Sequence, residues 1–530
     1  MNQGGGFIVP GEAPQTTIDF NEACIVLRPS IDNVAVCKMD LKAGVRIILK
    51  NDDILIKNLI SKGQRFAINK IMKGETVVQY GYPFGISAGI KKGELIHSGN
   101  IRPIQDDLEG NFITEPPKTI YDERYLTKTF KGYKRANGQV GTRCYYLIVP
   151  TSQCASQIAV QTASLAQEKY NISVSYPNID GFVAIPNTEG CGCASGLQIN
   201  RFLRILNNFI THPNVGGVLI IDLGCEQTNY TALFSYVKND STSLVVPTDW
   251  LTIQEVGGTQ KTIEKALNII GQRLPEINNA SRCECPIQHL LIGTECGASD
   301  SFSGITANPV IGNAVDKVIY GKGSAILSEV PEMIGAEKIL MRRMRNHEIV
   351  LKFKKMMRWY RALAEKLNVD MSDNLVPENI KGGLVNSCIK SIGAIAKGGT
   401  TAIEDVVHYG ERISKRGLNI MQGPGNDIES VTGIVASSAN IICFSTGKGT
   451  VTGTAIVPAI KISSTTELFQ KMPDDIDFDA GGLLSTLRSL SDFGDALLDL
   501  IISVASGKKT KSEINGQRQF QVWTAGKLSL

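Results

Sequence analysis

From residue 131 onward, the sequence alternates short runs of apolar residues with longer segments that have the composition of helices. Most of the runs end in loops rich in glycine, serine, threonine or cysteine. The runs are YYLIV (145–149), FVAI (182–185), VLII (218–221), HLLI (289–292), AIL (325–327), IICF (441–444) and AIVPAI (455–460). Buried strands of a parallel sheet have this continuous apolar character, and the helices between them cover the faces of the sheet. The sequence therefore predicts an α/β body built of parallel layers.

The N-terminal part of the chain has a different pattern. Its short apolar runs are separated by glycines at close and fairly regular spacing, as in KGQRFAINKIMKGETVV. Strands of this length joined by glycine turns are typical of a small all-β module. The predicted division of the chain is a tail over 1–30, the β module over 31–103, a polar linker over 104–130, a second α/β domain over 131–275 and a C-terminal α/β domain over 276–530.

Length and charge limit the classes of protein that remain. A chain of 530 residues is long enough for several domains, each with its own core. Its 55 basic and 51 acidic residues leave a net charge of +4, which does not indicate a nucleic-acid partner. No run approaches the ~18 apolar residues of a membrane span, and the N-terminal residues lack the pattern of a signal peptide. We therefore expect a cytoplasmic protein with no membrane partner, whose 12 cysteines are thiols.

Three cysteines follow the ends of predicted strands. Cys191 lies in PNTEGCGCASG, Cys225 in DLGCEQ and Cys296 in GTECGASDSFSG, and Cys193 is a second candidate in the first of these loops. Ligands of open parallel sheets bind beyond the carboxyl ends of the strands, so the three thiols are placed to converge on one crevice. Three thiolates with one position left open suit an iron centre or an iron–sulfur cluster. The alternative is that these cysteines simply pack in the interior.

A glycine-rich loop, STGKGT (445–450), follows another predicted strand. It lacks the residues of a P-loop, and GCGCASG does not fit the dinucleotide fingerprint, so a nucleotide-dependent oxidoreductase is disfavoured. The amides of Gly447 and Gly449 and the cation of Lys448 suit a carboxylate or another anion, and a plain tight turn is the alternative. The chain has five histidines, of which His97 lies at the end of the β module.

Several motifs together resemble those of a known family. They are EGCGCA, LGCE, ECGASDSFSGITANP (295–309), LSEVPEMIGAE (327–337), AKGGTT (396–401), VTGIVA (431–436) and FSTGKGT (444–450). In their order, and over nearly the whole chain, they resemble the altronate/galactarate dehydratases. The segment PEMIGAE (331–337) is closer to the altronate branch. The resemblance implies that residues 31–103 are the SAF (β-clip) domain of these enzymes.

The resemblance also implies an activity, which is the removal of water from a sugar acid to give a 2-keto-3-deoxy acid. The expected partner is a small-molecule sugar acid, here D-altronate, and self-association stays open. The family implies Fe²⁺, or sometimes Mn²⁺, and we assign Cys191, Cys225 and Cys296 as the metal ligands. Whether the iron is a single ion or part of an iron–sulfur cluster stays open. The expected substrate-binding residues are Arg143, Gly447, Lys448 and Gly449, and the expected catalytic residues are His97, Asp300 and Glu329. The metal would stabilise an enediolate while a base takes the C2 proton.

The chain departs from the family at polar positions. Gly63-Gln64-Arg65 stands where the family has Gly-His-Lys, so an imidazole is missing. Lys448 stands where the family often has arginine, which replaces a bidentate fork with a point charge. Either the substrate differs or the activity is weakened. A galactarate dehydratase, a related sulfo-lyase and a non-catalytic paralogue therefore stay open as alternatives to an altronate dehydratase.

Overall fold

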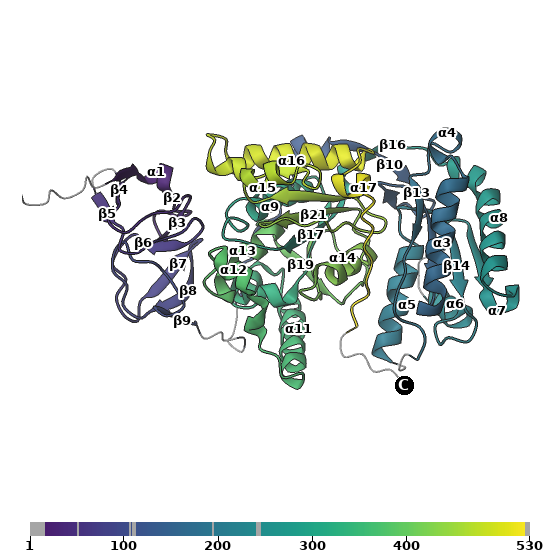
Figure 1. Ribbon diagram of the computed structural model, residues 1–530, viewed down its shortest axis with the longest axis horizontal. Helices are drawn as coiled ribbons and strands as arrows, with labels where there is room; N and C mark the ends of the chain where they lie inside the picture. The colour runs from purple at the N-terminus through teal and green to yellow at the C-terminus, as the bar shows by residue number, and fades with distance from the viewer. Residues whose placement is uncertain are drawn as a thin grey trace, which may run out of the picture. The chain divides into compact units, whose positions relative to one another are not determined.

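A computed structural model describes residues 16–49, 52–104, 108, 113–192, 196–239 and 245–524. The chain forms two compact units (Figure 1). The first comprises Met1–Asp107 with Leu375–Ile392, and the second comprises Leu108–Asn374 with Gly393–Leu530. In the described part of the chain, no helix is long and apolar enough to cross a membrane.

The first unit is built from three small sheets, as the glycine-punctuated pattern predicts. The sheets have the strand orders β1(Thr17–Asp19)-β4(Arg46–Leu49)-β5(Asp52–Leu55), β2(Cys24–Ile25)-β3(Val34–Cys37)-β6(Arg65–Ala67) and β7(Thr76–Gln79)-β8(Tyr82–Ser87)-β9(Ile101–Arg102). All pairs are antiparallel except β1 with β4. Because β1 and β2 pair with strands of the module, the described residues before position 31 belong to it and do not form a separate tail. Helices α1(Phe20–Ala23) and α12(Pro377–Lys381) complete this unit.

The second unit begins with a four-stranded parallel sheet. Its strand order is β13(Gly181–Ala184)-β12(Tyr145–Pro150)-β14(Val215–Asp222)-β15(Thr248–Thr252). Successive residues of β12 enter two different cores, since Tyr146 and Ile148 pack with α3(Gln153–Lys169) and α8(Thr259–Asn278), whereas Leu147 and Val149 pack with α5(Leu197–Ile210). This alternation explains the continuous apolar run at 145–149, because a strand covered on both faces needs apolar side chains at every position.

A seven-stranded parallel sheet follows. Its strand order is β19(Ile403–Val407)-β20(Gly417–Met421)-β18(Ser324–Leu327)-β17(Leu291–Gly297)-β21(Ile441–Thr446)-β22(Ala459–Ser463)-β23(Phe478–Asp479). The chain runs from β17 to one side of the sheet and later returns to the other side at β21. The strand order therefore reverses between β17 and β21, and such a reversal opens a crevice for ligands beyond the carboxyl ends of the strands.

Helices and short strands complete the second unit (Figure 1). The longer helices beside the large sheet are α9(Ala307–Tyr320), α11(His347–Lys366), α14(Asp427–Ala436) and α16(Leu490–Ala505). Strand β10(Thr129–Lys134) pairs antiparallel with both β11(Val140–Gly141) and β16(Cys283–Pro286). The shorter helices are α2(Glu123–Leu126), α4(Ile172–Ser175), α6(Tyr230–Asn239), α7(Ile253–Val256), α10(Glu337–Arg343), α15(Thr466–Lys471) and α17(Lys511–Ile514), while α13(Ser387–Ile395) leads from the first unit into the second. The predicted fold class, a small β module followed by parallel α/β layers, is confirmed.

Candidate functional site

Four ionisable side chains gather beyond the carboxyl ends of β17 and β18, and we call them the Lys397 cluster. All four are buried. They are Cys296 near the end of β17, Glu329 two residues after β18, Glu332 in the 3-10 turn η2(Val330–Met333) and Lys397 in the 3-10 turn η4(Ala396–Gly398). Since β17 borders the reversal of strand order, the cluster lies at the edge where parallel sheets bind ligands.

The ammonium group of Lys397 is the centre of the cluster. Its Nζ lies 2.6 Å from Glu329 Oε2, 3.0 Å from Cys296 Sγ and 3.8 Å from Glu332 Oε2. Cys296 Sγ lies 2.9 Å from Glu332 Oε2 and 3.5 Å from Glu329 Oε1. The Lys397 ammonium thus lies within ion-pair distance of two buried carboxyl groups.

The backbone is strained just after the two strands that lead into the cluster, β17 and β18. Glu329 has a φ of 66° and Ala298, two residues after Cys296, has a φ of 52°. A left-handed conformation costs a residue with a Cβ about 1–3 kcal/mol, and residues that keep it gather at functional sites. The strain at Glu329 therefore marks the end of β18 as a candidate site independently of its charge.

Helix α9 holds the segment that carries Lys397. A Cβ at Gly312 of α9 would lie 2.1 Å from the carbonyl oxygen of Ala396, so only glycine lets the turn approach so closely. Asp316, one helical turn later, accepts hydrogen bonds from the Thr400 amide and hydroxyl, both at 2.8 Å. These contacts fix the backbone on each side of Lys397 and so orient its long side chain.

The electrostatics of the cluster favour a base that works near neutral pH. Burial raises the pKa of Glu329 to about 7, the Lys397 ammonium acts in the opposite direction, and the Glu332 carboxylate adds to the rise. Burial and the neighbouring Glu329 also raise the pKa of Glu295 well above its usual value. Glu295 Oε2 accepts a hydrogen bond of 2.7 Å from the Ser430 hydroxyl. A carboxyl group with a pKa near the working pH exchanges protons most effectively.

The donor atoms of the cluster could hold a metal ion. Among the described residues, Cys296, Glu329 and Glu332 are the one group of three potential ligands whose atoms all lie within 4.8 Å of one another. A thiolate and two carboxylates suit a divalent transition metal. However, the Lys397 ammonium already contacts all three side chains, so a metal ion could enter only by displacing it.

Asp300 and the glycine-rich loop lie together at the same edge of the sheet. Asp300 accepts hydrogen bonds from the Ser303 amide at 2.8 Å and the Ser464 hydroxyl at 3.2 Å. The amides of Gly447 and Lys448 donate to the carbonyl of Ala298, and the Gly449 amide donates to the Thr446 hydroxyl at 2.9 Å. These amides are therefore used inside the loop. The group that can bind the predicted anion is therefore the exposed Lys448 side chain, and not the amides of Gly447 and Gly449.

The three predicted metal ligands differ in burial and in the sheet from which they come. Cys296 is buried in the Lys397 cluster, whereas Cys191 and Cys225 are exposed cysteines in loops of the four-stranded sheet. In the ranges that the structure describes, these three thiols do not form a group of ligand atoms within 4.8 Å. Cys296 follows β17 of the seven-stranded sheet, whereas Cys191 and Cys225 follow β13 and β14 of the four-stranded sheet, so the predicted ligands come from two different sheets. Cys193 lies outside the described residues.

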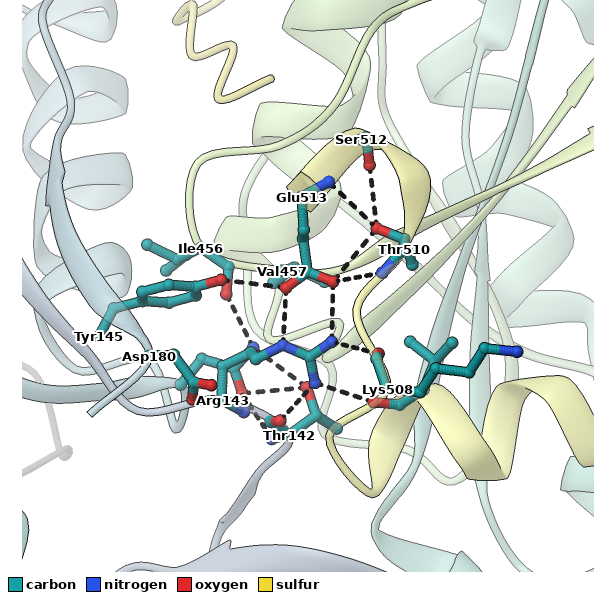
Figure 2. A network of polar contacts seen from close by, with 12 residues as sticks. Thr142, Arg143, Tyr145, Asp180, Ile456, Val457, Lys508, Thr510, Ser512 and Glu513 are labelled. Atoms are coloured by element: carbon teal, nitrogen blue, oxygen red, sulfur yellow. Dashed lines mark hydrogen bonds and ion pairs between the residues drawn. The ribbon is translucent and has the colours of Figure 1, made fainter. Parts of the chain in front are cut away.

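Arg143 links two parts of the second unit and is not placed to bind substrate (Figure 2). Its guanidinium forms an ion pair with the carboxylate of Glu513, with Nε 2.7 Å from Oε1 and Nη2 2.8 Å from Oε2. The remaining guanidinium contacts are hydrogen bonds to the carbonyl oxygens of Thr142, Val504 and Lys508. The side chain is 1% exposed, so no donor is left for a substrate carboxylate. The expected assisting role of Arg143 is replaced by a structural one.

His97 belongs to the first unit, where it forms part of a turn. Its Nδ1 accepts a hydrogen bond from the Gly99 amide at 3.1 Å, and its own amide donates to Asn100 Oδ1 at 2.9 Å. The residue is exposed. The bond from the Gly99 amide needs an Nδ1 without a proton, whereas an imidazole that donates a proton must first carry protons on both nitrogens. Turn capping and proton donation are therefore alternative roles of His97.

Three members of the site have no assigned role in the sequence-based predictions, namely Lys397, Glu332 and Glu295. Lys397 stands in AKGGTT, and a lysine among glycines resembles a solvated turn. Glu332 follows Glu329 by three residues, a spacing that places side chains on one face of a helical turn. That spacing is the signal that could have identified the pair. No comparable signal exists for Lys397, because its burial depends on Gly312 of another element.

Comparison with known proteins decides the family. Three family descriptions match successive parts of the chain: Altronate/galactarate dehydratase SAF domain over 22–103, D-galactarate dehydratase/Altronate hydrolase second domain over 132–278, and D-galactarate/Altronate dehydratase C-terminal over 287–528. The altronate dehydratases of Escherichia coli (strain K12) and Bacillus subtilis (strain 168) are each 32% identical to the chain. They cover 94% and 93% of this chain and 98% and 97% of their own length.

The chain belongs to the altronate/galactarate dehydratase family. It is therefore a sugar-acid hydro-lyase of this type, as the sequence motifs predict. The galactarate dehydratase (L-threo-forming) of Escherichia coli (strain K12) is also 32% identical, over 90% of this chain and 92% of its own length. Because relatives named for two different acids are equally similar, identity alone does not choose the substrate of this family member.

Proposed function

We propose that the chain removes water from D-altronate to give 2-dehydro-3-deoxy-D-gluconate. The observation that carries this proposal is the buried pair of Lys397 and Glu329, with 2.6 Å between Nζ and Oε2. The reaction needs a base for the C2 proton and a fixed positive charge where negative charge develops. A carboxyl group with a pKa of about 7 beside an ammonium group offers both.

In the proposed step, Glu329 takes the C2 proton while Lys397 faces the carboxylate of the substrate. The electrons of the broken C–H bond enter the carboxylate as an enediolate. They then form the C2–C3 double bond as the C3 hydroxyl leaves. That hydroxyl takes a proton, for which His97 is the proposed donor, and departs as water. The resulting enol ketonises to the 2-keto-3-deoxy acid, so no oxidant or reductant is needed.

The Lys397 cluster is closed to solvent, since Glu329 and Lys397 are each 1% exposed. A sugar acid therefore reaches them only after a covering segment moves. We propose that the exposed Lys448 attracts the anionic substrate before this movement, and that Asp300 holds the turn after β17 in place through Ser303 and Ser464. A closed site also excludes water from the enediolate once the substrate is bound.

Iron is the proposed metal, with Mn²⁺ as the alternative. When bound, it would supply a Lewis acid that helps the C3 hydroxyl leave. Every proton transfer proposed above is assigned to side chains of the chain itself.

Galactarate is the second candidate substrate, because a relative named for it is as similar as those named for altronate. Loss of the imidazole at Gln64 raises a third alternative, a paralogue that binds a sugar acid without turning it over. Both alternatives make different predictions from the altronate proposal in the same assay.

The test is an activity panel on the full chain, purified anaerobically and supplied with iron. D-altronate, galactarate and a sulfolactate are offered separately, and release of a 2-keto acid is followed. We expect turnover with altronate to exceed that with the other two acids. Turnover with galactarate alone would identify galactarate, and not altronate, as the substrate. Absence of turnover with all three, in protein whose circular dichroism shows a folded chain, would overturn the proposal.

A further inference from the structure

A second group of cysteines lies at the carboxyl edge of the four-stranded sheet. Cys154 follows β12 at the start of α3, Cys191 follows β13 and Cys225 follows β14. These three strands are neighbours and run parallel, with β12 in the middle. The loops after them therefore meet at one edge of the sheet, beside the reversal of strand order between β12 and β14.

The loop that carries Cys191 is pressed against the turn that carries Cys154. Gly190 has a φ of 92°, and a Cβ there would lie 2.5 Å from the Thr151 carbonyl oxygen and 2.7 Å from Ser152 Cα. The amide of Gln153 donates to the Glu189 carbonyl at 2.9 Å. Cys191 thus directly follows Gly190, which allows its loop to approach the turn after β12. Cys154 directly follows Gln153, whose amide bonds that loop.

The loop that carries Cys225 is tied to the same turn. Glu226 Oε1 accepts from the Thr151 hydroxyl at 2.7 Å and from the Leu223 amide at 2.9 Å. The Thr228 hydroxyl donates to the Thr151 carbonyl at 2.6 Å. Both cysteine loops therefore share Thr151 as an anchor. The side chains that make these bonds belong to Glu226 and Thr228, which follow Cys225, so the thiol itself lies outside the anchoring network.

The thiols are close to one another and open to solvent. Cys191 and Cys225 are each near enough to Cys154 to act on it electrostatically. All three cysteines are exposed. Free cysteine is usually buried in an apolar setting, so three exposed thiols on three mutually anchored loops are not explained by packing.

The spacing of the thiols favours a cluster over a single ion. Within the described ranges, Cys154, Cys191 and Cys225 are not all within 4.8 Å of one another. Metal–thiolate bonds of about 2.3 Å in a tetrahedral site would bring the sulfurs of one ion to about 3.8 Å. An iron–sulfur cluster distributes its thiolates over separate irons and tolerates wider spacing.

We propose that Cys154, Cys191 and Cys225 bind an iron–sulfur cluster in which one iron has no cysteine ligand from this set. The groups that act on Cys154 are Cys191, Cys225 and Glu226, and the three cysteine loops come from one parallel sheet. The open iron position would accept an oxygen ligand. This inference concerns where the iron binds, and it does not depend on which acid is the substrate.

The test measures the cluster itself rather than turnover. The full chain is reconstituted anaerobically with ferrous iron and sulfide, and iron, acid-labile sulfide, visible absorption and electron paramagnetic resonance are recorded. The variants are Cys154→Ser, Cys191→Ser and Cys225→Ser. The matched controls are Cys283→Ser, which changes another exposed cysteine, and Cys296→Ser.

We expect the wild type and both controls to hold iron and sulfide in equal amounts and to show the visible band of a cluster. Each of the three variants should fall to the level of protein that has not been reconstituted, with an unchanged circular dichroism spectrum. A full cluster in any one of the three variants would overturn the proposal. So would loss of the cluster in Cys296→Ser, or binding of iron without sulfide by the wild type. Failure of altronate turnover would leave these readouts unaffected, so the two proposals fail separately.

Discussion

Lys397 Nζ lies 2.6 Å from Glu329 Oε2, and both residues are 1% exposed. A buried ion pair is weak evidence for stability, because removing two charges from water costs about as much as their attraction returns. Glu329 also keeps a left-handed backbone that a structural carboxylate would not require. The pair is therefore better explained by the chemistry of the dehydratase than by its contribution to folding.

Replacement of Lys397 by Met should abolish activity and destabilise the chain. It leaves Glu329 and Glu332 without their shared cation, and breaking a buried pair in this way costs about 3–5 kcal/mol. We expect kcat to fall at least ~100-fold, a loss comparable to that of one preorganised electrostatic contact. Steady-state kinetics and thermal unfolding measure the two effects. Lys397→Arg keeps the charge and serves as the control. A Lys397→Met variant with wild-type kcat would exclude the proposed role.

The pH dependence of turnover should report Glu329. A base must be deprotonated before it accepts the C2 proton, and burial raises the pKa of Glu329 to about 7. We therefore expect kcat/KM to rise with pH and to level off above ~7. If the base were a glutamate with an unperturbed pKa, kcat/KM would level off above ~4.3. Initial rates between pH 5 and 9 measure this limb, with circular dichroism as the control for folding. A flat profile from pH 5 upward would contradict the assignment.

Arg143 should matter for stability and not for substrate affinity. Burial alone would raise the pKa of Glu513, but the paired guanidinium holds it below its usual value. Arg143→Met leaves that carboxylate buried without its partner, at a cost of about 3–5 kcal/mol. Chemical denaturation should show this loss, and the double variant with Glu513→Gln should recover part of it. KM of the folded fraction should not change. A large rise in KM with unchanged stability would restore the role in substrate binding.

The ion pair of Arg143 with Glu513 also makes the stability of the folded chain depend on pH. The pKa of Glu513 is lower in the folded than in the unfolded chain, where it is about 4.3. Glu513 therefore adds to the free energy of unfolding at pH values above about 4.3, and this contribution is lost as the pH falls below that value. We expect wild type to lose more stability than Glu513→Gln between pH 5 and pH 3. Thermal midpoints over this range measure the difference, and parallel curves for the two proteins would contradict it.

Variants of His97 distinguish a role in proton exchange from a role in capping a turn. In the His97→Gln variant we expect kcat to fall about 100-fold with little change in KM, since a positioned acid or base contributes about 10²–10⁴-fold. His97→Asn offers an oxygen that can accept from the Gly99 amide in place of Nδ1, so it tests the turn alone. Wild-type turnover in both variants would leave His97 as a capping residue. A gain of activity in Gln64→His would show that the missing imidazole weakens this chain.

The fold was largely predictable because its signals are local. The apolar run at 145–149 is continuous since β12 is buried on both faces, and glycine spacing distinguishes the β module from the α/β body. The strands at Thr17–Ile25 escaped prediction because each is two or three residues long. The site was predicted only in part. The sequence draws attention to Glu329 and Cys296, which lie at strand ends, whereas the position of Lys397 depends on a contact with Gly312 that no local pattern encodes. The resemblance gives Arg143 a role in substrate binding, and no local pattern reveals its partner Glu513, which is distant in the sequence.

The most direct test of the account is the rate of 2-keto-3-deoxy acid formation from D-altronate by wild type and by Glu329→Gln, at saturating substrate and equal iron content. Glutamine keeps the shape of the side chain but cannot accept the C2 proton. We expect kcat to fall about 100-fold or more while thermal stability is kept, and Glu378→Gln, which changes an exposed glutamate, to behave as wild type. A Glu329→Gln protein that forms the keto acid at the wild-type rate would contradict the account.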